Sequence, residues 1–131
     1  MELTGDTFNF GAATPILTSG TVKVQPFSTS FSSAQTFTNA TYGSAVSELT
    51  LGKPGNLGNI TIGSSISIAG SINVYGGDIV VNNSIGLTST GVGSDILLKA
   101  TGNITSNGDQ TYTTNGGDIT LWSNSDGSGG G

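Results

Sequence analysis

The stretch Gly77–Val81 reads Gly-Asp-Ile-Val-Val, and the same phrase returns along the second half of the chain. Its pattern is a Gly or Ser, then Asn or Asp, then Ile, a variable residue and a second aliphatic residue. The four copies are Gly58–Ile62, Gly77–Val81, Ser94–Leu98 and Gly117–Leu121. Their leading isoleucines lie 19, 17 and 23 residues apart, a spacing typical of one turn, or rung, of a solenoid.

The alternation of aliphatic and polar residues predicts that each phrase is a short strand with two side chains facing a core. Similar pairs follow within the repeat, for example Ile66 with Ile68 and Ile72 with Val74. Three short strands per rung, joined by corners of Gly, Asn and Ser, predict a three-sided coil of parallel strands, a β-helix. The alternative is an antiparallel β-sandwich, whose strands recur roughly every 8–12 residues. Repetition of the whole unit favours the β-helix.

The composition excludes several classes of protein. The chain has 131 residues, enough for one domain, and a net charge of −5 with three lysines and no arginine. Without a basic patch, binding to nucleic acid or to an anionic membrane surface has no electrostatic basis. The chain has no Cys, so disulfides and thiolate metal sites are excluded. No stretch approaches the ~20 apolar residues of a membrane-spanning helix, so we expect no membrane insertion.

Residues 1–50 differ from the repeat because they hold all five phenylalanines. Short alternations predict strands at Phe8–Phe10, Thr21–Val24 and Ser47–Leu51. We expect one continuous domain, in which residues 1–50 form aromatic-rich rungs or a cap and residues 51–131 form regular rungs. We also expect the chain to be a piece of a longer repetitive protein.

The polar residue before each leading isoleucine is Asn59, Asp78, Asp95 or Asp118. If the four phrases stack in register, these side chains form one column, and a calcium ion can bridge the adjacent carboxylates. The competing interpretation, which we favour, is that each side chain bonds the backbone of its own corner. We therefore expect no cofactor, with calcium as the one candidate. With no His, Cys or Arg, the commonest catalytic bases, thiol nucleophiles and anion clamps are missing, and we expect no enzymatic activity.

The outward positions of the phrases point to a possible interaction face. Val80 and Leu97 are aliphatic where the alternation predicts a polar residue, and the single tryptophan, Trp122, follows the last phrase. On one flat side of the coil these residues would form an apolar stripe, which is typical of a partner site. The competing interpretation is that a loop from residues 1–50 covers the stripe.

Three stretches, Leu49–Ile62, Ile96–Ile104 and Asn115–Leu121, resemble the repeats of giant bacterial surface proteins, the filamentous-haemagglutinin-type and related repetitive adhesins. The resemblance covers about residues 45–126 and implies a right-handed parallel β-helix exported to the cell surface. It implies a structural or adhesive role in a surface or filament protein, and it carries over no catalytic residue. The expected partners are other copies or neighbouring repeats of the same protein, and surface glycans. The alternative function is a polysaccharide-binding or depolymerising β-helix module.

Overall fold

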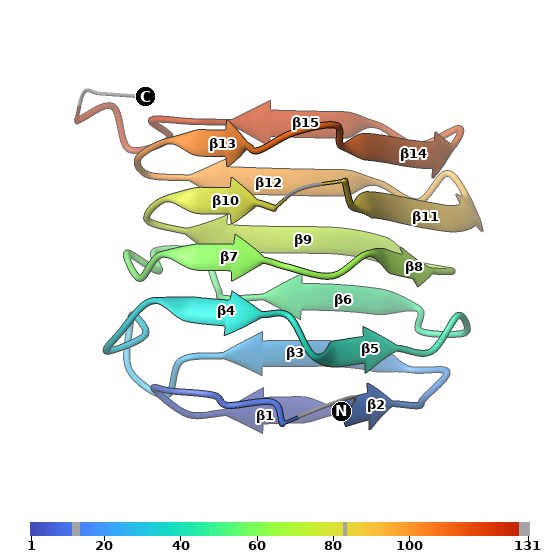
Figure 1. The fold of residues 1–131 in the computed structure, drawn as a ribbon, viewed down its shortest axis with the longest axis horizontal. Helices are drawn as coiled ribbons and strands as arrows, with labels where there is room; N and C mark the ends of the chain where they lie inside the picture. Colours follow the sequence, from blue (N-terminus) through green and yellow to red (C-terminus); the bar gives the residue numbers. More distant parts are fainter. Residues whose placement is uncertain (12–13, 83, 129–131) are drawn as a thin grey trace.

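The protein is a parallel β-solenoid of about five rungs (Figure 1). The structure is a computed structural model and describes residues 1–11, 14–82 and 84–128. Every strand pair in it is parallel. The predicted β-helix is therefore confirmed, and the antiparallel β-sandwich alternative is wrong.

The strands form three sides. The first side is a six-stranded sheet of β1 (Glu2–Thr4), β3 (Thr21–Gln25), β6 (Glu48–Leu51), β9 (Ser71–Gly76), β12 (Ile96–Ala100) and β15 (Ile119–Trp122). The second side is a four-stranded sheet of β4 (Gln35–Phe37), β7 (Ile60–Ile62), β10 (Ile79–Val81) and β13 (Ile104–Ser106). The third side combines two short sheets, one of β2 (Thr14–Ile16) and β5 (Ala40–Tyr42), the other of β8 (Ile66–Ile68), β11 (Gly86–Val92) and β14 (Thr111–Asn115).

The chain climbs from the N-terminal rung to the C-terminal rung as a right-handed coil. In Figure 1 the strands of the second and third sides run to the right in front, and those of the six-stranded sheet return to the left behind. Right-handed crossover is the strongly preferred connection between parallel strands, because strands twist to the right.

Columns of aliphatic side chains fill the interior. Along the six-stranded sheet one column runs through Val22, Leu49, Ile72, Ile96 and Ile119. A second runs through Leu3, Val24, Leu51, Val74, Leu98 and Leu121. Between the two ends these side chains are fully buried, and each contributes about 1.5–3 kcal/mol relative to an exposed side chain. The core is therefore a continuous dry column, since each rung covers the one before it.

The four phrases do not stack on one side, and the predicted register is wrong. On the second side, Ile79 pairs with Ile60 of the preceding rung and with Ile104 of the following rung. Ile96 and Ile119 pair on the six-stranded sheet. The phrase therefore begins strands of two different sides, because both sides start at a corner where an Asn, Asp or Ser precedes an inward aliphatic residue.

Residues 1–50 supply strands to all three sides, next to the N-terminal end of the coil (Figure 1). The strands predicted at Thr21–Val24 and Ser47–Leu51 are present as β3 and β6. Phe8–Phe10 is not a strand. The rings of Phe8 and Phe10 stack at 6.1 Å between centroids and lie against the rings of Phe31, in the β3–β4 loop, and Phe37, in β4. An aromatic cluster thus replaces a strand at this end.

Candidate functional site

The three residues of the predicted interaction face lie on two different sides of the coil. Val80 belongs to β10 on the second side, between Thr61 and Thr105. Leu97 and Trp122 belong to the six-stranded sheet, in β12 and β15. The prediction that all three residues form a single stripe is therefore wrong. It required the four phrases to stack on one side of the coil, and they lie on two sides. Residues 1–50 form their own rungs and do not extend along these strands in Figure 1.

Val80 and Leu97 should contribute little to stability, because both side chains are partly exposed on outer faces. We expect the double variant Val80→Ser/Leu97→Ser to lose about 1–2 kcal/mol of unfolding free energy, the cost of lower β-propensity at two strand positions. Urea unfolding measures the loss. A loss of about 4 kcal/mol or more would show that these side chains are covered core, and would rule them out as an accessible surface.

On the outer face of the six-stranded sheet, Trp122 continues a column that the sequence pattern did not reveal. In register, Tyr75 of β9 lies next to Lys99 of β12, which lies next to Trp122 of β15. The Lys99 Nζ atom is 4.1 Å from the centroid of the Trp122 ring, a cation–π contact. We call these three residues the aromatic column. The feature of the sequence that could have revealed this column is that each of its three positions lies one rung after the previous one.

The polar residues before the leading isoleucines form two hydrogen-bonded ladders instead of one column. In the first, the Asn59 side-chain oxygen accepts from the backbone N–H of Asp78 at 2.8 Å, and the Asp78 carboxylate accepts from the N–H of Asn103 at 2.8 Å. In the second, Ser71 accepts from the N–H of Asp95 at 3.0 Å, and Asp95 accepts from the N–H of Asp118 at 2.8 Å.

The ladders change the interpretation of these side chains in two ways. The side chains of Asn59, Asp78 and Asp95 bond the backbone of the next rung, whereas the sequence predicted a bond to their own corner. The predicted column of three carboxylates does not form, because Asp78 lies on a different side from Asp95 and Asp118. Within the described ranges, no three acidic, His or Cys side chains form a group able to hold a metal ion. The ladders therefore serve to join the rungs.

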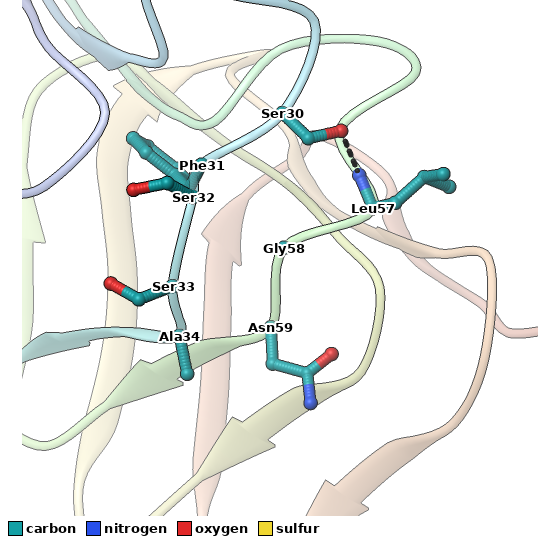
Figure 2. A pocket seen from close by; sticks show the side chains of 8 residues that line it. All are labelled: Ser30, Phe31, Ser32, Ser33, Ala34, Leu57, Gly58 and Asn59. Carbon is teal, nitrogen blue, oxygen red and sulfur yellow. Dashed lines mark hydrogen bonds between the residues drawn. The ribbon is translucent and has the colours of Figure 1, made fainter.

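One open depression of about 420 Å³ lies where the β3–β4 loop meets the β6–β7 loop. Its lining residues are Ser30, Phe31, Ser32, Ser33, Ala34, Leu57, Gly58 and Asn59 (Figure 2). The Ser30 hydroxyl accepts from the Leu57 backbone N–H at 2.9 Å, across the depression. The Ser32 hydroxyl donates to the Asp6 carbonyl at 3.2 Å. The first bond joins the two loops, and the second joins the β3–β4 loop to the N-terminal segment. No residue that lines the depression is charged.

The Tyr42 hydroxyl is buried, and no hydrogen-bond partner for it exists in the described part of the chain. Burial raises the pKa of this hydroxyl above its ordinary value. Folding therefore favours the protonated form, and the unfolded chain, with an ordinary pKa of about 10, loses the proton first. Stability attributable to Tyr42 is complete below pH 10 and declines as the pH rises further.

The Tyr42→Phe variant should be more stable by about 1 kcal/mol at pH 7, because it removes a buried polar group that has no partner. It should also lose less stability than the wild type between pH 10 and pH 11. Chemical unfolding at several pH values tests both effects. The Tyr75→Phe variant is the control, since it removes a hydroxyl from the outer face and keeps Tyr42. Equal alkaline losses in the wild type and Tyr42→Phe would contradict the prediction.

No protein-family model, curated protein or solved structure matches this chain. Along the described ranges the chain has no helix long and apolar enough to cross a membrane. The β-solenoid repeat is thus established from the fold, and any function has to be argued from the geometry of the coil and its surface.

Proposed function

We propose that the chain is a non-enzymatic structural segment of a secreted bacterial surface or filament protein, which spans distance and mediates adhesion or self-association. The observation that carries the proposal is the pair of uninterrupted aliphatic columns along the six-stranded sheet, from Val22 to Ile119 and from Leu3 to Leu121. A coil whose contacts run between neighbouring rungs extends by adding rungs, without rebuilding a central core.

The polar groups of the coil support a structural role. Asn59, Asp78 and Asp95 each bond the backbone of the following rung, so their side chains stabilise the stacking. Catalysis generally requires polar groups that converge on a reactant in a cleft. The depression beside Ser30 and Leu57 is open and holds no charged side chain.

Antibodies raised against the 131-residue chain test the proposed location. We expect them to label intact cells of the producing organism, and beads coated with the chain to adhere to a target cell layer more than beads coated with albumin. Labelling that requires cell lysis would contradict a surface role. If the coated beads adhere no more than albumin beads, the role of the chain is to span distance and does not include adhesion.

The aromatic column favours a second candidate function, polysaccharide binding. Tyr75 and Trp122 lie on either side of Lys99 on the outer face of the six-stranded sheet, and Trp122 is 48 % exposed. Aromatic faces and a flanking amino group are suitable for contacts with the apolar faces and hydroxyls of sugar rings. A glycan array tests this candidate: binding should be lost in Trp122→Ala and kept in Thr120→Ala, a change to the neighbouring outward position. Equal binding by both variants would exclude the column as the site.

A further inference from the structure

Two neighbouring loops at one corner of the coil are longer than the other turns at that corner. From the six-stranded sheet to the second side, the chain turns through residues 77–78 between β9 and β10 and through residues 101–103 between β12 and β13. The same turn takes residues 26–34 in the β3–β4 loop and residues 52–59 in the β6–β7 loop (Figure 1). Insertions into a repeat tend to lie on one face of the coil, often the face that binds a ligand.

Hydrogen bonds fix the two loops in one arrangement. The Asn56 side chain accepts from the Phe31 backbone N–H at 3.1 Å and donates to the Tyr75 carbonyl of the following rung at 2.8 Å. On the N-terminal side, the backbone N–H and the hydroxyl of Ser28 donate to the Asp6 carboxylate at 3.2 Å and 3.1 Å. The loops therefore have neighbours on both sides along the coil. The depression between them is formed before a ligand arrives, which lowers the entropic cost of binding.

The depression is suited to a small neutral ligand. Its volume of about 420 Å³ lies within the range typical of small-molecule sites, roughly 300–1,000 Å³, and none of its lining residues is charged. The Lys53 ammonium group of the β6–β7 loop donates to the Pro26 carbonyl at 3.2 Å and does not line the depression. An anionic ligand would therefore lose hydration without gaining a cation as its partner.

The lining offers hydrogen-bond donors next to an apolar surface. Figure 2 shows Ser30 and Leu57 at one end of the depression and Ala34 and Asn59 at the other. The Ser30 hydroxyl accepts from Leu57 and makes no other hydrogen bond within the described ranges, so its own hydrogen is free to donate. The Asn59 amide nitrogen makes one long bond of 3.5 Å, to Asp78, and has a second N–H to donate. Leu57 is 63 % exposed and adds an apolar wall.

A sugar ring matches this combination, because its hydroxyl oxygens accept hydrogen bonds and its ring C–H groups form an apolar face. We propose that the depression binds a neutral sugar unit of a surface glycan. The inference rests on the adhesive role in the proposed function, and it names the class of ligand. It assigns that ligand to the two long loops, on a different part of the coil from the aromatic column. The depression is open, so the rest of the glycan extends into solvent.

A printed array of neutral and acidic oligosaccharides tests the class of ligand with the 131-residue chain. We expect binding to neutral glycans that persists when the salt concentration is raised, since no ion pair contributes to it. In an NMR titration with the neutral oligosaccharide that binds best, the amides of Ser33, Ala34 and Gly58 should shift, while those of β12 should not. The titration uses the unmodified chain, so it does not depend on the folding of a variant.

The variant Ala34→Phe fills the depression, and Thr36→Phe is its matched control. Ala34 lines the depression and is exposed, so the larger side chain occupies the space that the sugar needs. Thr36 is exposed on the outer face of β4 and does not line the depression. Binding on the array should be lost in Ala34→Phe and kept in Thr36→Phe.

Three results would each overturn the site: no binding to any neutral glycan, amide shifts confined to the aromatic column, or equal array binding by Ala34→Phe and Thr36→Phe. The adhesive role is measured separately with coated beads. If beads coated with the wild-type chain and beads coated with Ala34→Phe adhere equally well to the target cells, adhesion stands and the depression is not its site.

Discussion

Replacing Gly70 by Ala should destabilise the protein by about 3 kcal/mol or more, at the upper end of the cost of overpacking. Gly70 lies at the corner before β9, where its backbone N–H bonds the Val46 carbonyl of the previous rung at 2.9 Å. A Cβ atom added there would overlap the carbonyl group of Ser47 and crowd the backbone nitrogen of Glu48. Backbone atoms cannot rotate away as a side chain can, so relief requires the two rungs to separate.

Separation of the rungs at this corner would disturb more than one contact. The Ser89 hydroxyl, on the next rung, donates to the Gly70 carbonyl at 2.8 Å and is buried there. A shift of Gly70 therefore also strains a hydrogen bond made inside the core, where an unpaired group costs about 1–3 kcal/mol. Urea unfolding followed by circular dichroism measures the total loss.

Gly86 provides a matched control for Gly70. A Cβ atom at Gly86 would meet the Thr111 carbonyl oxygen at 3.8 Å, an ordinary contact. The Gly86→Ala variant should therefore stay within about 0.5 kcal/mol of the wild type. If Gly70→Ala is as mild as Gly86→Ala, the rungs at the Gly70 corner are not held at the close spacing that the structure gives them.

Sequence patterns predicted the class of fold because a parallel coil has a local signature. In many strands inward aliphatic residues alternate with polar ones, and small polar residues mark the corners, as in Gly58–Ile62. These features depend on neighbouring residues only. The number of sides and the parallel stacking follow from the length of the repeat and the number of strands in it.

Which strands stack on one another could not be predicted in the same way, because the strands of two of the three sides begin with the same short phrase. Asn59 and Asp78, which are 19 residues apart, do lie on successive rungs of one side. The next member of that ladder is Asn103, 25 residues further along, whereas Asp95 begins a strand of the six-stranded sheet. Loops of different length separate the sides, and a fixed short phrase carries no information about which corner it follows.

The incorrect register also explains why the candidate surface residues were grouped wrongly. An outward position could be recognised from alternation at Val80, Leu97 and Trp122, and the structure places all three on outer faces. Their grouping required knowledge of which strands are neighbours. The contact of Lys99 with Trp122, made between adjacent strands of one sheet, was missed for the same reason.

Replacing Asn56 by Ala should lower the free energy of unfolding by about 3 kcal/mol or more. This loss is comparable to that of Gly70→Ala, but it comes from unpaired polar groups and not from steric overlap. Asn56 lies just before the first phrase and is 1 % exposed. Its side-chain oxygen accepts from the backbone N–H of Phe31 at 3.1 Å and from that of Gly58 at 3.0 Å. Its amide nitrogen donates to the carbonyl of Gly58 at 3.1 Å and to that of Tyr75 at 2.8 Å.

The bonds to Phe31 and Tyr75 join three successive rungs, since Phe31 precedes β4, Asn56 precedes β7 and Tyr75 lies in β9. The two bonds to Gly58 hold the corner before β7. In the Ala variant the backbone groups at this site lose their partner in a place where the side chain had excluded water, and each one left unpaired costs about 1–3 kcal/mol. This role could not be predicted from the residue type, because Asn also occurs at many exposed corners. The role depends on burial, which only the stacked rungs create.

Urea unfolding of Asn56→Ala should be compared with that of Asn73→Ala. Asn73 is partly exposed on the outer face and makes one long bond of 3.4 Å to Glu48, so its removal should change stability by less than about 0.5 kcal/mol. Hydrogen exchange adds a local test. In Asn56→Ala the amides of Phe31 and Gly58 should exchange faster, because both donated to the missing oxygen, while those of β12 should follow the global stability alone. Equal losses in the two Asn variants would show that the Asn56 bonds do not join the rungs, and that the apolar columns alone set the stability of the coil.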